Sequence, residues 1–420
     1  MPEVSVIIPD YNQSRFVTAA IDSVLQQSFR AVEIIVVDDG STDDSAAVIA
    51  RYGDRVRYIY QQNQGLGAAR NTGIKAATGR FVGLLDADDA WLPTYLTHMM
   101  TLVARHPDAA VYYANARYMD VNGAEMPGLV TGAPVAPDQV YAQLLRANFL
   151  IPSTILLRRD VVMAAGLFEQ QNRAMHGCED WDLWLRLAPH HRFVGAYTPL
   201  VRYRVHGGSL SAGVDKMQRA ARAVVEKHVG VDEGDPAAWP ASKRRAYGGL
   251  YRYDALTSVQ RQGDWDAAAG YLALALAIDP SLAVDLELFY DLALGTQPPA
   301  LHGTTRDLDL RANRAHVRAL LTRLFAAADA VGPPELARRT WGTAWCALGL
   351  AAYNHGDFGA SRQAFLHAVT LRPALWRDPR VRGGLLKSLL GASLVARLRT
   401  VRRHPAWSPT WTTERPPRGL

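Results

Sequence analysis

Cysteines, long apolar runs and an apolar leader are scarce or missing in this sequence of 420 residues. Its two cysteines, Cys178 and Cys346, lie far apart along the chain, which excludes a disulfide-stapled secreted fold. We therefore expect a reducing compartment, the cytoplasm. No apolar run reaches about 18 residues, so no segment is predicted to span a membrane. Met1-Pro2-Glu3 leads directly into the first apolar run, and a signal peptide is not expected.

An acidic excess is also lacking, and the basic charge lies late in the chain. Residues 1–230 carry 22 basic and 23 acidic side chains, whereas residues 231–420 carry 24 and 17. Residues 380–420 contain nine Lys and Arg against the single acid Glu414. We do not expect nucleic acid as a partner, because this tail has no recognisable reading motif. An anionic membrane surface suits it better, and peripheral contact with the inner face is expected.

The N-terminal half alternates short apolar runs with helical patterns. The runs at 4–8, 32–37, 56–60 and 81–85 predict strands, and the segments 16–25 and 46–50 predict helices. Alternation at this pace indicates an α/β fold with a parallel, doubly wound sheet.

Polar clusters follow three of these predicted strands. They are Pro9-Asp10-Tyr11-Asn12, the stretch from Asp38 to Asp43, and Asp86-Ala87-Asp88-Asp89. Because the carboxyl ends of parallel strands border one crevice, we expect the clusters to meet there. Like charges massed in this way need a cation, and Mg²⁺ or Mn²⁺ carried by a diphosphate is suitable. The spacing of the last cluster alone equally allows a solvated turn that caps the next helix.

Four motifs in this order resemble inverting family 2 glycosyltransferases of the GT-A fold. They are Val-Ser-Val-Ile-Ile-Pro-Asp-Tyr-Asn (4–12), Val-Asp-Asp-Gly-Ser-Thr-Asp (37–43), Gly-Ala-Ala-Arg-Asn-Thr-Gly (67–73) and Leu-Asp-Ala-Asp-Asp (85–89). The resemblance covers about the first half of the chain. It implies a nucleoside-diphosphate sugar donor and a divalent ion on the Asp-X-Asp motif. The implied donor contacts are Pro9, Tyr11 and Asp39 on the base with Asp38 behind them, Arg70 on the diphosphate or base side, Asp86 on the ribose, and Asp88 on the metal.

One glycine-rich stretch resembles a different cofactor site. Residues 65–70, Gly-Leu-Gly-Ala-Ala-Arg, begin like a dinucleotide-binding fingerprint but lack its third glycine. The stretch also follows the third predicted strand, and no acid stands at the expected distance, so a nicotinamide enzyme is not expected. For Arg70, a phosphate contact suits the guanidinium fork, and the alternative is a surface arginine on a helix.

A second acidic cluster opens a predicted helix at residues 179–187. Trp181, Trp184, Leu185 and Leu187 recur at helical spacing, which places Glu179 and Asp180 on the first turn. The helix dipole favours anions there, and this alone could explain both acids. The stretch resembles the family's catalytic Glu-Asp pair. That resemblance makes Asp180 the expected general base and places Glu179 and Trp181 at the acceptor.

His206 precedes a Gly-Gly-Ser segment that resembles the family's C-terminal lid. Imidazole is an acceptable ligand for Mn²⁺, so we expect His206 to contact the metal or the diphosphate. The alternative is a structural histidine, which is the more usual role of a lone histidine.

Strand signals vanish beyond a Gly- and Pro-rich stretch. Residues 231–242 are the predicted linker between a GT-A domain at 1–230 and an all-helical domain at 243–380. Residues 263–267 match residues 356–360 at an offset of 93, with a shared Gly-Asp. These hairpins resemble tetratricopeptide repeats, although the offset is not a whole number of ~34-residue repeats. Such an array predicts docking of a protein partner.

The last segment, 381–420, is predicted to be a basic helix and tail. An apolar stripe runs along it at Leu386, Leu390, Leu394, Leu398 and Val401. This stripe either lies on an anionic membrane or caps the helical array.

The expected reaction is transfer of one sugar at a time, with inversion, from a nucleoside-diphosphate sugar. The resemblance favours a UDP-sugar and a hydroxyl of a glycan, lipid-linked or protein acceptor. Processive synthases of the family carry Gln-X-X-Arg-Trp, which is absent here. A nucleotidyltransferase is not expected, since its Gly-rich N-terminal motif is missing. A non-catalytic scaffold with a degenerate transferase domain stays open as the alternative.

Overall fold

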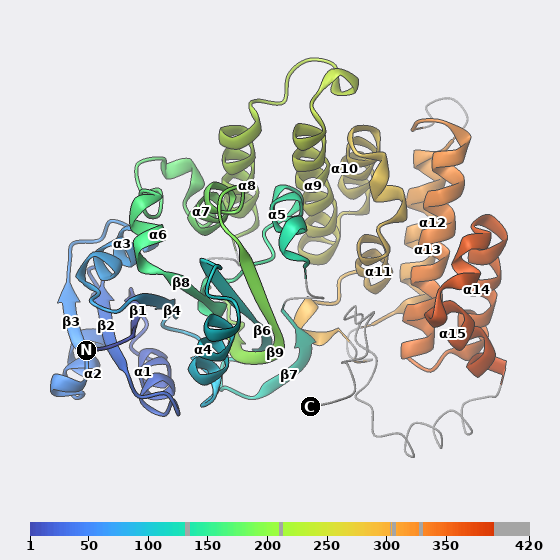
Figure 1. The fold of residues 1–420 in the computed structure, drawn as a ribbon. Coiled ribbons are helices and arrows are strands. Elements are labelled where there is room, and N and C mark those ends of the chain that lie inside the picture. The colour runs from blue at the N-terminus through green and yellow to red at the C-terminus, as the bar shows by residue number, and fades with distance from the viewer. Residues whose placement is uncertain (131–134, 210–212, 303, 305–307, 327–330, 390–420) are drawn as a thin grey trace. The chain divides into compact units, whose positions relative to one another are not determined.

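The computed structural model describes residues 1–130, 135–209, 213–302, 304, 308–326 and 331–389. They form two compact units, the first ending at Val231 and the second beginning at Asp232. The first unit is α/β and the second is helical (Figure 1). The predicted fold class, a GT-A type α/β sheet followed by an all-helical region, is confirmed.

The first unit contains one nine-stranded sheet within the described residues. Its strands are β1 (Val4–Asp10), β2 (Val32–Asp38), β3 (Arg57–Tyr60), β4 (Phe81–Leu84), β5 (Ala90–Trp91), β6 (Val111–Met119), β7 (Glu125–Leu129), β8 (Ile155–Arg158) and β9 (Phe193–Arg204). The order across the sheet is β3-β2-β1-β4-β8-β6-β9-β5, with β7 beside β6. Its helices are α1 (Val17–Leu25), α2 (Ser45–Ala50), α3 (Leu66–Ala76), α4 (Tyr95–Arg105), α5 (Val140–Arg146), α6 (Arg159–Ala164), α7 (Glu179–Leu187) and α8 (Val214–Val229).

The parallel sheet predicted from the N-terminal alternation holds for four strands. β1 pairs in parallel with β2 and β4, and β2 pairs in parallel with β3. Beyond β4 the sheet is mixed, because β8 runs antiparallel to both β4 and β6. The parallel arrangement expected from the N-terminal alternation is therefore confirmed for the strands that carried it, and the later strands make the sheet mixed. An antiparallel strand needs no crossover helix on the sheet face, and an apolar run in the sequence does not record strand direction.

Helices cover both faces of the parallel strands, which explains why these strands are apolar throughout. Val6 and Ile8 of β1 share a core with residues of α1 and α4, while Ile7 faces α3. Figure 1 shows α1 and α3 on opposite sides of this part of the sheet. A Cβ on Gly73 would lie 2.3 Å from Cγ2 of Ile7, so only glycine lets α3 lie this close to β1. That contact fixes the height of Arg70, one turn earlier on α3.

The second unit is built from helix pairs, and its described residues contain no strand. The helices are α9 (Ala241–Thr257), α10 (Trp265–Ile278), α11 (Leu286–Leu294), α12 (Leu310–Leu324), α13 (Pro334–Asn354), α14 (Phe358–Leu371) and α15 (Pro379–Leu389). α9 packs against α10, and α13 packs against α14.

The two sequence segments matched at an offset of 93 adopt the same local structure. Gly263 and Gly356 have φ of 67° and 83°, which suits glycine at a helix end. The aspartates that follow cap the next helices: Asp264 accepts from the Ala267 N–H at 2.8 Å, and Asp357 accepts from the Ala360 N–H at 2.9 Å. The tetratricopeptide assignment stays a prediction. The apolar stripe predicted for the last helix lies, apart from Leu386, outside the described residues.

Candidate active site

The first polar cluster lies where β1 and β2 end side by side. Asp10 and Asp38 are paired in the register of the two strands. The Asp38 carboxylate accepts hydrogen bonds from the Tyr58 hydroxyl at 2.6 Å and the Ser41 N–H at 2.7 Å. Pro9 is buried beneath this edge, whereas Tyr11 is 48% exposed. Of the residues predicted to meet the base, Tyr11 therefore has a ring that is open to a ligand.

Asp39 ties the end of β2 to the loop that precedes α3. Its carboxylate accepts from the Gln61 Nε2 at 2.6 Å, the Gln64 N–H at 3.0 Å and the Gly65 N–H at 2.8 Å. Gly65 has φ of 94°, a conformation that glycine adopts without strain. Asp39 thus orders the loop that leads into α3, a role that the sequence did not indicate.

Asp10 is a buried acid of the first polar cluster for which the sequence predicted no role. Its Oδ2 accepts from the Ser41 hydroxyl at 3.1 Å. Burial raises the pKa of Asp10 to about 6, and the nearby carboxylates of Asp38 and Asp43 add to the rise.

The third cluster forms a tight turn after β4 in which each acid has a different partner. Asp89 is buried and accepts from the Ser153 hydroxyl at 2.5 Å and the Arg204 N–H at 2.9 Å. Burial, with the charges of Asp88 and Asp86, holds the pKa of Asp89 well above its usual range. Asp89 is therefore the structural acid of the three, and Ser153 also accepts from the Asp86 N–H at 3.1 Å.

Asp88 and His206 meet across 118 residues of sequence. The His206 Nε2 lies 3.0 Å from the Asp88 Oδ2, and the two side chains are 11% and 21% exposed. The imidazole packs on the Phe16 ring, and the neighbouring Arg204 donates through Nε to the Asp88 carbonyl at 2.7 Å. Burial, with the charge of Asp86, raises the pKa of Asp88, while His206 opposes the rise. The structure thus brings together the two residues predicted to hold the metal.

No group of three or more His, Cys, Asp and Glu side chains is arranged to hold a metal in the part of the chain that the structure describes. One carboxylate and one imidazole fit an ion that completes its coordination with phosphate oxygens and water.

Arg70 does not point to solvent as a surface arginine would. Its side chain is 2% exposed, with Nη2 2.7 Å from the Asp86 Oδ1 and Nη1 3.2 Å from the Glu179 Oε1. The alternative of a surface helix arginine is excluded. Asp86, whose side chain is 22% exposed, lies at the open end of this bridge.

Asp180 lies at the start of α7 beside this bridge. Its Oδ2 accepts from the Asn148 Nδ2 at 3.0 Å, and its Oδ1 accepts from the Trp181 N–H at 2.8 Å. Burial and the charge of Glu179 raise the pKa of Asp180 to about 7, while Arg70 and these two hydrogen bonds lower it. A carboxyl with a pKa near neutrality can take up and release a proton at working pH.

The two residues predicted to touch the acceptor are held inside the protein. Glu179 is buried and accepts from the Gly177 N–H at 2.7 Å, in addition to its ion pair with Arg70. Trp181 is buried, and its indole N–H donates to the Leu144 carbonyl at 2.7 Å. Asn148 is exposed and bonded to Asp180, so it is the more accessible neighbour of the expected base. No sequence signal pointed to Asn148.

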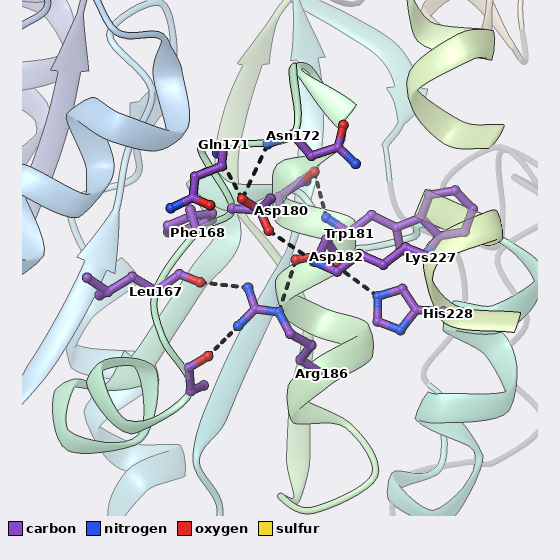
Figure 2. Close-up of polar contacts among 12 residues, drawn as sticks. Leu167, Phe168, Gln171, Asn172, Asp180, Trp181, Asp182, Arg186, Lys227 and His228 are labelled. Carbon is purple, nitrogen blue, oxygen red and sulfur yellow. Dashed lines mark hydrogen bonds and ion pairs between the residues drawn. The ribbon is translucent and has the colours of Figure 1, made fainter. Parts of the chain in front are cut away.

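Asp182, two residues further along α7, is another residue that the sequence patterns did not single out. It is fully buried and contacts three basic side chains: the Arg186 Nε at 3.0 Å, the Lys227 Nζ at 2.8 Å and the His228 Nε2 at 3.0 Å. Figure 2 shows Arg186 also reaching the carbonyls of Ala165 and Leu167, and His228 approaching from α8. Burial would raise the pKa of Asp182, but the hydrogen bonds from His228 and Lys227 and the charge of Arg186 outweigh it and lower the pKa.

Comparison with known proteins agrees with this geometry. The model of the Glycosyl transferase family 2 matches residues 5–165. WfaP of Escherichia coli, a UDP-Glc:alpha-D-GlcNAc-diphosphoundecaprenol beta-1,3-glucosyltransferase, is 30% identical over 240 residues, which cover 55% of this chain and 88% of WfaP. This chain belongs to glycosyl transferase family 2. The family membership confirms the resemblance carried by the four N-terminal motifs.

Other relatives of this family 2 protein extend beyond the matched region. An uncharacterized glycosyltransferase of Rickettsia prowazekii is 30% identical over 214 residues, which cover 49% of this chain and 64% of the relative. The chain spans between 27% and 64% of the length of the first five curated relatives. A crystal structure of TarS from S. aureus is 15% identical, covers 96% of this chain and 92% of TarS, and has a TM-score of 0.44.

No helix among the described residues is long and apolar enough to cross a membrane. Cytoplasmic location stays a prediction.

Proposed function

We propose that this protein transfers one sugar at a time, with inversion, from a nucleoside-diphosphate sugar to an acceptor hydroxyl. The observation that carries the proposal is the placement of Asp180, a buried carboxyl with a pKa raised to about 7, next to the Arg70 bridge that leads to Asp86. A base tuned near neutrality beside an acidic crevice is what acceptor deprotonation requires. The similarity to WfaP, which uses UDP-Glc as donor, favours a UDP-sugar.

The donor would bind along the carboxyl edge of β1, β2 and β4. The ring of Tyr11 is exposed enough to stack on the base, and Asp86 presents its free edge to the ribose. Asp38 and Asp39 would mainly support the groups that touch the donor, because their carboxylates already accept two and three hydrogen bonds within the protein. Arg70 is committed to two carboxylates, so we assign the diphosphate contact to other groups.

Asp88 and His206 would hold Mn²⁺ or Mg²⁺ together with the donor diphosphate. Such an ion neutralises the negative charge that develops on the leaving nucleoside diphosphate. The contribution of the chain is to hold an oxygen and a nitrogen ligand 3.0 Å apart with Phe16 behind the imidazole.

The transfer itself needs no covalent intermediate. The acceptor oxygen attacks the anomeric carbon from the face opposite the diphosphate, its proton passes to a carboxylate oxygen of Asp180, and the bond from the anomeric carbon to the phosphate oxygen breaks. Inversion follows from this single displacement, and the oxocarbenium-like character of the transition state is typical of glycosyl chemistry.

The proposed acceptor is a hydroxyl group, and the helical unit and the basic tail are the proposed contacts with partners. A glycan, lipid-linked or protein hydroxyl would serve, and the name of WfaP favours a lipid-linked sugar. The helical unit would dock a protein partner, since it leaves Leu366, Trp376 and Leu386 between 53% and 63% exposed. The basic C-terminal segment would add contact with an anionic membrane.

Two substitutions separate binding from chemistry. Asp88→Ala should abolish donor affinity in the presence of Mn²⁺ and with it turnover. Asp180→Asn keeps the shape but cannot accept a proton, so transfer should fall by about 10²–10⁴-fold while donor binding survives. Calorimetric titration with UDP-glucose and UDP-N-acetylglucosamine, beside an assay of nucleotide release, measures both.

The control for these variants is Asp160→Asn, a charge loss at an exposed acid on α6. A native transfer rate in Asp180→Asn would mean that Asp180 only caps α7. If the unmodified protein binds no nucleotide-sugar of a UDP, GDP and dTDP panel, the non-catalytic scaffold becomes the better account. In a thermal-shift format, a donor at a hundred times its dissociation constant should add about 2.7 kcal/mol.

A further inference from the structure

The most unusual side chain of the first unit is Arg70, a fully buried cation that bridges two acidic motifs. Its partners Asp86 and Glu179 lie 16 and 109 residues away in sequence. Asp86 belongs to the turn after β4 and Glu179 to the start of α7. The guanidinium fork therefore joins the donor side of the proposed site to the helix that carries the proposed base.

The geometry of this bridge is fixed by the packing of α3. Asn71, the next residue, clamps the backbone of Phe168 from both sides: its Nδ2 donates to the Phe168 carbonyl at 2.8 Å, and its Oδ1 accepts from the Phe168 N–H at 2.9 Å. The guanidinium carbon of Arg70 lies 5.4 Å from the centre of the Phe168 ring. A Cβ on Gly67 would approach the Glu179 Cγ to 3.2 Å, so α3 and α7 are in close contact here. Arg70 has little freedom to swing toward another ligand.

The charges around Asp180 are few and can be named. Glu179 is the neighbouring anion, Arg70 is the nearby cation, and Asn148 and the Trp181 N–H are neutral donors. Asp182, two residues on, is paired with basic side chains of its own, Arg186, Lys227 and His228. The charge balance at the base therefore depends on Arg70 and Glu179.

Arg70 also has one N–H group that takes no part in the bridge. Its Nε–H is buried and has no hydrogen-bond partner among the described residues. A buried donor without an acceptor is costly, so the ion pairs of the guanidinium with Asp86 and Glu179 must offset that cost. Asp86, the partially exposed end of the bridge, is the carboxylate that the donor would engage.

We propose that Arg70 is a positioning residue that couples the donor-side carboxylate Asp86 to the acceptor-side pair Glu179 and Asp180, rather than a ligand of the diphosphate. This inference rests on the proposed function, in which Asp180 is the base. Through the bridge, Arg70 holds Glu179 in place and favours the ionised, proton-accepting form of Asp180. When the donor engages Asp86, less of the guanidinium charge is balanced there, so its field acts more strongly on Glu179 and Asp180 and the base is most ready when the donor is bound.

The direction of each effect follows from charge. Removing the cation with Arg70→Met raises the pKa of Asp180, whereas removing the neighbouring anion with Glu179→Gln lowers it. The double variant removes both and should return the pKa close to that of the parent. Arg70→Lys keeps the charge but loses the two-pronged geometry, so its shift should be smaller than that of Arg70→Met.

Carboxyl ¹³C NMR of the full chain, labelled at aspartate, reads the pKa of Asp180 without any ligand. The Asp180 resonance is identified by its loss in Asp180→Asn. We expect an upward shift of about one pH unit in Arg70→Met and a downward shift of similar size in Glu179→Gln. Arg80→Met is the matched control, because Arg80 is a surface arginine whose loss changes the net charge equally.

The outcomes separate this coupling from the proposed function. If Arg70→Met leaves the Asp180 resonance titrating as in the parent, the coupling is wrong, whatever the activity. Should Arg70→Met fail to fold, the comparison of Glu179→Gln with Arg70→Lys still decides, since unshifted titration in both would overturn the proposal.

The functional arm is the pH profile of UDP release from UDP-glucose. In Arg70→Met, activity lost at neutral pH should recover toward the parental rate above about pH 8, a recovery that a merely misfolded site would not show. If the NMR shifts appear but the pH profile does not follow them, Asp180 is not the base, and the proposed function fails while the coupling stands.

Discussion

Asp180 and Asp182 lie two residues apart on the same helix, both are buried, and their surroundings drive them in opposite directions. Asp180 faces an anion, Glu179, a nearby cation, Arg70, and two neutral donors, and burial with the Glu179 charge raises its pKa to about 7. Asp182 faces Arg186, Lys227 and His228, and its pKa is lowered. Burial alone therefore does not decide the state of a carboxyl. The balance of nearby charges and hydrogen bonds decides it.

Asp182 and Asp180 therefore have different roles on α7. The basic partners of Asp182 come from α7 itself and from α8. Arg186 also donates to the Ala165 carbonyl and, as Figure 2 shows, to the Leu167 carbonyl. This network holds the first turn of α7 in place. Asp180 can then remain poorly stabilised as an anion, which a general base requires.

The strongest way to break the comparison is to remove the anchoring carboxylate. Asp182→Asn removes the buried carboxylate that Arg186, Lys227 and His228 share, and we expect a loss of about 3–5 kcal/mol in the free energy of unfolding of the first unit. Urea unfolding monitored by tryptophan fluorescence measures it. Asp160→Asn, which loses an exposed ion pair with Arg158, should change stability by less than about 1 kcal/mol. Equal effects in the two variants would contradict the anchoring role.

The pH dependence of stability sharpens the comparison, because the two acids contribute with opposite signs. Asp180 has a folded pKa above its ordinary value, so it favours the fold at low pH and this contribution is lost as pH rises toward about 7. Asp182 has a depressed folded pKa, so its contribution is present at neutral pH and is lost as pH falls below about 4.

Asp180→Asn should accordingly stabilise the first unit by about 2–3 kcal/mol at pH 8 and have little effect at pH 4. Thermal unfolding of the parent and the variant at both pH values measures the difference. Greater stability of the variant at pH 4 than at pH 8, relative to the parent, would reverse the sign and refute the raised pKa.

The smallest expected change in the free energy of unfolding comes from the two basic side chains of α8 that contact Asp182, namely Lys227 and His228. The Lys227 side chain is 35% exposed, and it also pairs with Glu169 at 3.3 Å. Because solvent screens it, Lys227→Met should cost about 0.5 kcal/mol, whereas His228→Asn, at a 14% exposed position, should cost about 1 kcal/mol. A larger loss from Lys227→Met than from His228→Asn, in the same urea assay, would show that burial does not rank these partners.

Much of the site could be predicted from local sequence. An apolar run that ends in an acid predicts a carboxylate at the edge of a sheet, which is where Asp38 and Asp86 lie. Acids before an amphipathic pattern predict the first turn of α7, and Gly-Asp pairs predict the caps of α10 and α14. These features depend on backbone geometry within a few residues, which short-range patterns record.

Such patterns did not predict the direction of the strands, and they did not reveal β6 and β9. β8 lies between β4 and β6 and runs antiparallel to both, although its sequence looks like that of any buried strand. The partners of a strand are set by long-range topology, and side-chain alternation carries no record of them.

The sequence by itself determined which side chains lie at the carboxyl edge of the sheet and at the start of α7. Only the tertiary structure decided what each of them can do. Arg70 meets Glu179 across 109 residues, His206 meets Asp88 across 118, and His228 meets Asp182 across 46. The physical reason is that the charge state of a buried carboxyl depends on burial and on which cations lie within a few ångströms, and both are properties of packing between distant segments.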